Sequence, residues 1–492
     1  MKKINLLLVV MSLVFGAAFL NSCRKDETAV IPDAPSVTAP SSTISVDAEQ
    51  SVEVSFTINS PGGFASANAN AQGGSVTILS QPEAASTSGT IVVSFTAGTI
   101  GGTASVTVTV NDVNQKSDNA TAVLSVAKEE IVISVGSNIS SNTTWKTGKV
   151  YILETRISVL TGVTLTIEPG VVIKGKAGTG ANATALIIAR GATIMAEGTA
   201  AAPIIFTSIA DEIMPGEIAS PNLEPDLNGL WGGLIVLGSA PISADAESQQ
   251  IEGIPASDQN GLYGGTTADD NSGVIKYISI RHGGANIGEG NEINGLTLGG
   301  VGSGTIIENV EIVSNQDDGI EWFGGTVNVK NALLWNVGDD AVDTDQAWAG
   351  TIDNFVIINP GDECFELDGP EGSYNGAGHT IKNGTVSVEG ASGLIDFDAN
   401  TDVNMKDIYF FNLSADGGQD VEEYDKYSAN ANGFASSGFQ VTLPAGIALT
   451  DVFKGGSDAI TTVVDAGAAT VGADLTQFSD WTWASVAGEL AF

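Results

Sequence analysis

The sequence of 492 residues carries 58 acidic and 19 basic side chains, which give a net charge of −39 at neutral pH. So acidic a surface repels nucleic acid and anionic lipid headgroups, excludes both as direct partners, and attracts divalent cations. Sixty glycines and a near absence of helical apolar periodicity predict an all-β chain with frequent turns.

The N-terminus has the pattern of a secretory signal over residues 1–22, with two lysines before an apolar stretch at residues 4–20. The last residues before Cys23 resemble a bacterial lipobox, which implies a lipid on Cys23 and no other membrane contact. Arg24-Lys-Asp-Glu27 resembles the export signal of Bacteroidota surface lipoproteins, which implies an outer-membrane anchor facing the cell exterior. The alternative is a solvated charge cluster beside an unrelated cysteine.

Residues 23–40 form a predicted tether rich in Pro, Ser, Thr and Ala. Residues 41–127 contain short alternating runs such as 52–58, 91–95 and 104–110, bounded by polar turns. Strands at this spacing predict a small immunoglobulin-like β-sandwich. This segment has no His or Cys and few acids, so we expect it to act as a spacer.

Residues 129–434 show a coil repeat, first visible where 165–173 matches 186–194. Units of roughly twenty residues that each form one supersecondary piece predict a β-solenoid. After residue 434 the repeat fades, and we expect residues 435–492 to form C-terminal coils and a cap that shields the last coil.

Within the coils, one short acidic phrase recurs four times. Its copies are Asp318-Gly-Ile-Glu321, Asp340-Ala-Val-Asp343-Thr-Asp345, Glu363-Cys-Phe-Glu366-Leu-Asp368 and Leu394-Ile-Asp396-Phe-Asp398. Glu321, Asp343, Glu366 and Asp396 correspond, at steps of 22, 23 and 30 residues (343 − 321, 366 − 343, 396 − 366). Apolar and acidic residues alternate, so each phrase predicts a strand with one buried and one wet face. Stacked strands would bring these acids to about 4.8 Å spacing in a column.

A second recurring position carries an amide. Its members are Asn309, Asn331, Asn354 and Asn383, with Asp407 in the last coil. Stacked amides can donate to one neighbour and accept from the next, so we expect an internal ladder at a turn. The alternative is that each Asn only favours a turn locally.

The acid column predicts a cation site. Adjacent carboxylates at about 5 Å repel by about 1 kcal/mol in water and about 3 kcal/mol at an effective dielectric of 20. Calcium takes six to eight oxygen ligands and fits better than magnesium, whereas zinc lacks His and Cys ligands here. The expected calcium ligands are Glu321, Asp343, Asp345, Glu366, Asp368, Asp396 and Asp398. The alternative is an acidic face whose repulsion is screened by salt.

Residues 145–490 resemble a right-handed parallel β-helix, the fold of pectate lyases and polygalacturonases. The phrases at 231–238, 278–284 and 318–325 also resemble a group of Bacteroidota lipoproteins without a settled function. The resemblance implies fold and location, because function depends on the site and not on the fold.

A catalytic alternative uses the same acids. Asp318-Gly-Ile, followed by Gly338-Asp-Asp340, resembles the aspartate motifs of polygalacturonase-type hydrolases. That resemblance would make Asp318, Asp340, Asp343 and His282 the catalytic candidates. The match departs from the family pattern: those enzymes carry His-Gly and Arg-x-Lys after the aspartates. Here His282-Gly comes before them and no Arg-x-Lys follows.

The sequence thus favours a lipid-anchored surface protein whose β-helix face binds extracellular glycan or a surface protein, with calcium between acidic coils. Trp335 is the expected stacking platform, because it aligns with Arg281, Val313 and Ile358 in an outward column, while Trp322 points into the core. Two alternatives stay open: a glycoside hydrolase or polysaccharide lyase of the pectin-degrading type, and a structural surface scaffold.

Overall fold

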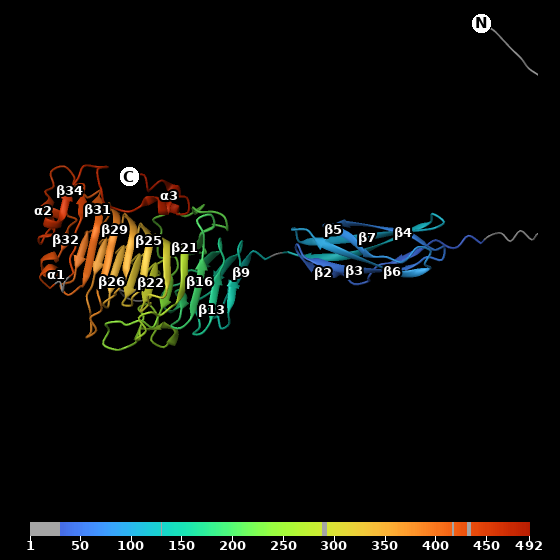
Figure 1. The fold of residues 1–492 in the computed structure, drawn as a ribbon, viewed down its shortest axis with the longest axis horizontal. Coiled ribbons are helices and arrows are strands. Elements are labelled where there is room, and N and C mark those ends of the chain that lie inside the picture. The colour runs from blue at the N-terminus through green and yellow to red at the C-terminus, as the bar shows by residue number, and fades with distance from the viewer. Residues whose placement is uncertain (1–29, 129, 288–292, 416–417, 431–433) are drawn as a thin grey trace, which may run out of the picture. The chain divides into compact units, whose positions relative to one another are not determined.

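The computed structural model describes residues 30–128, 130–287, 293–415, 418–430 and 434–492. The chain divides into two compact units, one ending at residue 129 and the other running from 130 to 492 (Figure 1). Cys23 and the signal segment lie outside the described residues, so the anchor stays a prediction, as do the domain boundaries drawn from the sequence. Within the described part, no helix has the length and apolar character needed to cross a membrane.

The first unit is a sandwich of two four-stranded sheets, as expected for an immunoglobulin-like fold. One sheet has the order β1 (Ser36–Thr38), β3 (Ser51–Asn59), β6 (Ser88–Ala97), β5 (Gly74–Ser80); the other has β2 (Ile44–Asp47), β8 (Ser117–Ala127), β7 (Gly102–Asp112), β4 (Phe64–Gln72). Alternate residues of the strands, such as Phe56, Phe95 and Leu124, are buried between the sheets. The prediction of an all-β sandwich at the N-terminal side is confirmed.

The second unit is a right-handed parallel β-helix built from two long sheets (Figure 1). The fifteen-stranded sheet contains β9 (Val132–Val135), β10 (Thr143–Trp145), β11 (Val150–Leu153), β13 (Thr164–Ile167), β14 (Val172–Gly175), β16 (Thr193–Glu197), β17 (Ile204–Ser208), β21 (Gly273–Arg281), β23 (Ile306–Val313), β25 (Asn328–Trp335), β27 (Thr351–Ile358), β29 (His379–Ser387), β31 (Val403–Phe411), β33 (Phe439–Val441) and β34 (Thr461–Val463). The nine-stranded sheet contains β12 (Ile157–Val159), β15 (Leu186–Ile188), β18 (Leu234–Leu237), β22 (Leu296–Gly299), β24 (Ile320–Phe323), β26 (Val342–Asp345), β28 (Phe365–Leu367), β30 (Ile395–Phe397) and β32 (Val421–Glu422). The predicted solenoid is therefore confirmed.

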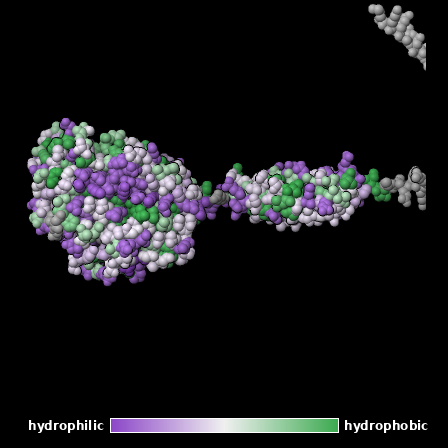
Figure 2. All heavy atoms as spheres, viewed as in Figure 1, coloured by the Kyte–Doolittle hydropathy of each residue, from purple (hydrophilic) through white to green (hydrophobic). Residues whose placement is uncertain are grey.

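The remaining described elements are short. They are the hairpin β19 (Gln249–Gln250) and β20 (Leu262–Tyr263), the helices α1 (Tyr424–Asn430), α2 (Leu449–Val452) and α3 (Trp483–Ala487), and the 3-10 turns η1 (Gly180–Asn182), η2 (Gln259–Gly261), η3 (Ser457–Ile460) and η4 (Leu475–Phe478). Between the two long sheets runs one continuous apolar core of stacked Ile, Val, Leu and Phe side chains. Outside it, Figure 2 shows a broad hydrophilic patch on the visible face of this unit.

The large sheet bends at one residue in each strand from β21 to β31. The bend residue has a left-handed backbone, with φ of 59° at Asn309, 57° at Asn331 and 63° at Asn354. Asn tolerates this conformation better than most residues, because its short polar side chain bonds locally. The amides also connect the coils: Nδ2 of Asn331 donates to Oδ1 of Asn309 at 2.6 Å, and Nδ2 of Asn354 donates to Oδ1 of Asn331 at 2.8 Å.

The predicted ladder is shorter than expected. Asn383 donates to Oδ1 of Asp353 at 2.6 Å instead of to Asn354. The freed oxygen of Asn354 accepts the backbone N–H of Asp474 at 2.6 Å. The C-terminal segment therefore ends the amide ladder at its third member.

That C-terminal segment also differs from its predicted role. Trp481 and Trp483 do not shield the last coil; they pack on the outer face of the large sheet against Val313, Trp335 and Ile358. The outward column of Trp335 is present as predicted, since β25 pairs it with Val313 on one side and Ile358 lies on the other. Only 3% of Trp335 is exposed, however, so it offers no open stacking platform.

Replacing the central ladder residue tests the role of the amides. Asn331→Ala removes two buried hydrogen bonds. It also places a residue that cannot form local polar bonds at a left-handed backbone position, so we expect the free energy of unfolding to fall by about 3 kcal/mol. Asn331→Gly keeps the backbone conformation and is expected to lose about 2 kcal/mol. Thermal and chemical denaturation measure both, with exposed Lys330→Ala as the control. Equal stability of Asn331→Ala and Lys330→Ala would show that the ladder contributes nothing.

Candidate functional site

The nine-stranded sheet places the repeated acids in one column. Its ladders pair Glu321 with Asp343, Asp343 with Glu366, and Glu366 with Asp396. The predicted register of these four acids is therefore present. Asp396 pairs onward with Glu422 in β32, a fifth member that the sequence analysis missed because the phrase is not repeated there.

The column passes from buried to open. Glu321 and Asp343 expose only 5% and 9% of their surface, Glu366 and Asp396 are half-buried, and Glu422 is exposed. The insertion between β18 and β21 causes the burial, since its apolar side chains cover the outer face of the first strands. This cover consists of Ile242, Ile251, Ile254 and Tyr263, packed on Ile187, Ile235, Leu237 and Phe323.

A second row of acids lies at the turn before each strand and links the coils. Oδ1 of Asp318 accepts the backbone N–H of Asp340 at 3.1 Å, and Oδ1 of Asp340 accepts that of Glu363 at 2.7 Å. These carboxyl groups are nearly buried, with 7% of Asp318 and 5% of Asp340 exposed. Part of their role is therefore structural, because they satisfy backbone donors at the corner.

At the covered end, three carboxyl groups converge. Single oxygens of Asp318, Glu321 and Asp343 lie within 4.8 Å of one another. Nδ2 of Asn294 donates to Glu321, while Oδ1 of Asn294 has no donor, although the side chain is only 4% exposed. Oδ1 of Asp343 likewise lacks a donor. Buried acceptor oxygens without donors are costly, and a cation removes that cost.

A second group of this kind, Asp317, Asp318 and Asp339, shares Asp318. Both groups consist of carboxylates alone, the ligand type preferred by hard cations. The buried acidic clusters can therefore hold a metal ion.

Burial and mutual repulsion shift the pKa values of these acids. Burial first, and neighbouring carboxylates next, raise the pKa of Asp318, Glu321 and Asp343 well above the usual range. Burial, a hydrogen bond with Glu366 and the charge of Glu366 raise the pKa of Asp340 to about 10. Without a cation, Asp340 holds its proton near neutral pH.

The acids toward the open end of the column have less strongly raised pKa values. Burial, followed by the charges of Glu371 and Asp368, raises the pKa of Asp345 to about 7. Burial and the charge of Glu366 raise the pKa of Asp368 to about 6. The strand-end acids therefore titrate close to neutral pH.

The predicted metal ligands are thus divided between two places. Glu321 and Asp343 belong to the buried group of three carboxylates, whereas the other five continue along the column and the adjacent strand ends. These five are Asp345, Glu366, Asp368, Asp396 and Asp398. Asn294 was missed, although Asn294-Gly-Leu precedes β22 as Asp318-Gly-Ile precedes β24 and could have been aligned with it.

The catalytic candidates are also divided. Asp318, Asp340 and Asp343 lie together, but His282 lies under the C-terminal segment, with Nδ1 2.5 Å from the carbonyl oxygen of Leu227. Its ring centroid is 5.6 Å from that of Trp483, and burial lowers its pKa. The structure gives His282 no contact with the acid column.

Two further side chains, Trp322 and Cys364, are buried in the protein. Trp322 is fully buried and stacks on Trp348 with ring centroids 4.5 Å apart, so it is a core residue as expected. Cys364 is buried, and its thiol donates weakly to the carbonyl oxygen of Gly393 at 3.7 Å. Burial raises the pKa of this thiol, which makes it a poor nucleophile.

The stacked coils define a protein of the parallel β-helix class, and comparison with known proteins identifies its family. Residues 137–482 match the pectate-lyase-like β-helix domain, and the chain belongs to this family. No curated protein matches the sequence.

Two solved structures are similar over most of the chain. The Family 28 exopolygalacturonase of Yersinia enterocolitica has 10% identity and a TM-score of 0.21, covering 85% of this chain and 88% of its own. The catalytic unit of the GH87 α-1,3-glucanase of Streptomyces thermodiastaticus strain HF3-3 has 12% identity and a TM-score of 0.21, covering 84% and 88%. At these scores neither likeness bears on function.

The raised pKa values predict a pH dependence of stability. A carboxyl group whose pKa is higher in the folded chain binds its proton more tightly there, so stability falls as pH rises from the unfolded value of about 4 through the folded value. With folded values of about 6 for Asp368 and about 7 for Asp345, the metal-free melting temperature is expected to fall between pH 5 and 8. Asp343→Asn, which has no proton to lose, is expected to flatten this fall. Identical slopes for both proteins in calorimetry with chelator would contradict the assignment.

Proposed function

We propose that the acidic face of the β-helix binds a calcium ion at its covered end and an extracellular glycan along its open end. The observation that carries the calcium site is the convergence of Asp318, Glu321 and Asp343 within 4.8 Å, next to Asn294, whose Nδ2 donates to Glu321 and whose Oδ1 has no donor. In this proposal the protein is held at the outer membrane by a lipid on Cys23 and acts outside the cell.

The choice of calcium follows from the ligand set. Three carboxylates and one amide oxygen supply only oxygen, and they come from three neighbouring coils: Asn294 from one, Asp318 and Glu321 from the next, and Asp343 from the third. Calcium tolerates irregular coordination by oxygen, whereas magnesium requires a near-ideal octahedron. Zinc is disfavoured because neither His nor Cys belongs to the described carboxylate groups.

The open end supports the glycan part of the proposal. Glu366, Asp396 and Glu422 present acceptors at the spacing of adjacent strands, about 4.8 Å apart, on a half-buried to exposed surface. Sugar hydroxyls can donate to such a row, and an acidic glycan can bind it through shared calcium. Membership of the pectate-lyase-like family agrees with a polysaccharide ligand. A surface protein that offers the same donors is the alternative partner.

Calcium binding can be measured directly. We expect isothermal titration to detect calcium and chelator to lower the melting temperature of the wild-type protein. Asp343→Asn removes a central ligand, and we expect it to weaken binding by about tenfold or more, because affinity at such sites follows the charge of the ligands. Asp465→Asn, at an exposed position after β34, serves as the control. No heat with calcium, together with a melting temperature unmoved by chelator, rules out the site.

Glycan binding needs a separate measurement. On a glycan array, we expect the wild-type protein to bind acidic or hydroxyl-rich polysaccharide with calcium present and to lose acidic ligands with chelator. The double variant Glu366→Gln/Asp396→Asn is expected to lose binding while it keeps calcium at the covered end. If no glycan on the array binds, the glycan-binding function is rejected and the structural surface scaffold is favoured.

Hydrolysis is the second candidate, favoured by one observation. Asp340, with its pKa raised to about 10 beside Glu366, stays protonated at neutral pH, as a general acid must. Its 5% exposure and its bond to the backbone of Glu363 argue against access to a glycosidic oxygen. If the protein cleaves polysaccharide, a panel of polyuronates will yield new reducing ends or unsaturated products, and Asp340→Asn will abolish them. A panel without products rejects this candidate.

A further inference from the structure

A single column of charged side chains runs along the outer face of the fifteen-stranded sheet. The strand ladders place its eight members in consecutive coils, with Glu168 directly after the last residue that β13 pairs with β16. In order along the solenoid, the members are Glu168, Glu197, Lys276, Glu308, Lys330, Asp353, Lys382 and Lys406. All eight side chains are exposed or half-buried, so they form a surface that another molecule can reach.

The column is electrically balanced, although the protein is not. It holds four acidic side chains and four lysines, in a sequence with 58 acidic and 19 basic residues. Two copies of so acidic a chain repel each other wherever acids predominate. This column is therefore a place where one copy can approach another without net repulsion.

Ion pairs within the chain account for the middle of the column. Nζ of Lys276 lies 3.0 Å from Oε2 of Glu308. Nζ of Lys382 lies 3.3 Å from Oδ2 of Asp353. Lys330 lies between these two pairs, and no ion pair within the described residues engages it. The alternation of charge here stabilises neighbouring strands, because opposite charges on adjacent strands attract.

The same explanation fails at both ends of the column. Glu168 lies beside Glu197 at one end, and Lys382 lies beside Lys406 at the other. Like charges at opposed positions of adjacent strands destabilise a sheet. Lys146 offsets the first case by pairing with Glu168 at 2.8 Å, but no ion pair in the described part of the chain engages Glu197 or Lys406. The charges at the ends therefore have no partner that the chain itself explains.

The order of charges is antisymmetric about the midpoint between Glu308 and Lys330. Counted outward from that point, each residue has a counterpart of opposite charge the same number of coils away. The four pairs are Glu308 with Lys330, Lys276 with Asp353, Glu197 with Lys382, and Glu168 with Lys406. A two-fold axis through the midpoint, parallel to the strands, sets the members of each pair opposite one another in two copies.

We propose that this face binds the same face of a second copy of the chain, in antiparallel orientation about that axis. Each of the four pairs then occurs twice, and the two glutamates at one end of each copy face the two end lysines of the other. A hollow of about 330 Å³ at the axis, lined in part by Ile306, Glu308 and Lys330, gives room for opposing side chains. None of the eight residues belongs to the buried carboxylate groups, so this association is independent of the calcium site.

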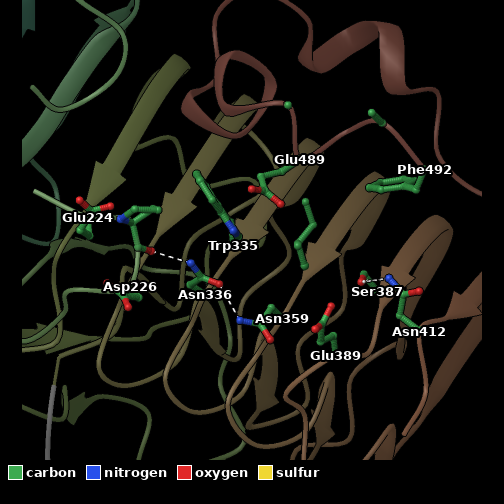
Figure 3. A pocket seen from close by; sticks show the side chains of 14 residues that line it. Glu224, Asp226, Trp335, Asn336, Asn359, Ser387, Glu389, Asn412, Glu489 and Phe492 are labelled. Atoms are coloured by element: carbon green, nitrogen blue, oxygen red, sulfur yellow. Dashed lines mark hydrogen bonds between the residues drawn. The ribbon is translucent and has the colours of Figure 1, made fainter.

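The face is narrow because the C-terminal segment covers the other half of the sheet. Past the bend, Trp481 and Trp483 pack on Trp335. Figure 3 shows the end of this segment, with Glu489 and Phe492, lining one hollow with Trp335. Eight coils at strand spacing give a face about 34 Å long. So narrow a strip buries less than the roughly 800 Å² per partner of a standard interface, so we expect a dissociation constant of roughly 10–100 μM.

Sedimentation equilibrium of the full chain in chelator measures this association, at concentrations on both sides of the expected dissociation constant. Lys330→Glu sets two glutamates against each other across the axis, and we expect association at least about tenfold weaker. Glu308→Lys sets two lysines against each other and is expected to have the same effect. Lys128→Glu, at an exposed position in the first unit, is the control with the same change of charge.

A mixture of the two variants separates pairing between copies from pairing within one. In a mixed pair, the substituted side chains of Lys330→Glu and Glu308→Lys face each other with opposite charge, as do the two unchanged ones. We expect the mixture to associate with nearly wild-type affinity, although each variant alone stays monomeric, with folding verified by circular dichroism. A wild-type chain that stays monomeric, variants that associate as well as wild type, or a mixture that stays monomeric would each overturn the proposal.

The end of the column allows a second measurement. Lys406→Glu gives Lys382 a neighbour of opposite charge, so the melting temperature of the monomer is expected to rise slightly. Association is expected to weaken in the same variant, because two glutamates then approach each other between copies. Stability and association thus move in opposite directions, which pairing within one chain does not produce. Unchanged association of Lys406→Glu would contradict the pairing of Lys406 with Glu168.

Discussion

The parallel hydrogen-bond ladder between coils is the constraint on which the rest of the structure depends. It fixes each residue beside its counterpart in the next coil, as in the pairs Glu321–Asp343 and Glu366–Asp396. Side chains of one kind are therefore stacked at strand spacing whether or not they attract one another. Apolar residues form the continuous core in this way, and amides form a ladder. Acids in the same arrangement cannot satisfy one another and need a proton or a cation.

The strength of the repulsion between these carboxylates depends on where they lie along the solenoid. At the covered end, the insertion with Ile242 and Tyr263 removes water from Glu321 and Asp343, so repulsion acts in a medium of lower effective dielectric. At the open end, water and salt reach Glu422 and screen the same repulsion. One repeated phrase therefore gives two environments: a buried one at the covered end and a solvated one at the open end.

The sequence was sufficient to predict the solenoid, the acid register and the position of the bend, because each leaves a local pattern that recurs at the period of the coil. The burial of the column was not predictable, because it depends on how the insertion packs on Ile187 and Phe323, which are distant in sequence. The burial of Trp335 was not predicted for the same reason. Trp481 and Trp483, which pack against it, follow it by more than a hundred residues, and no repeat in the sequence relates them to it. His282 was a catalytic candidate because His282-Gly resembles the His-Gly motif of the family, although it precedes the aspartates; in the structure its ring contacts the carbonyl oxygen of Leu227.

At the proposed calcium site, protons and the ion are alternative ways to relieve the repulsion between the same carboxylates. Burial raises the pKa of Asp318, Glu321 and Asp343, so an ion bound at the proposed site would compete with protons for these carboxylates. That competition weakens as pH rises, which would couple occupancy of the covered end to the acidity of the surroundings. Once an ion replaces the protons, its charge lowers the pKa of the neighbouring acids, beginning with Asp345, which lies beside Asp343 in β26. Under the proposed function, the open end would then become more fully ionised, so that ion binding at the covered end would prepare the acceptors at the open end.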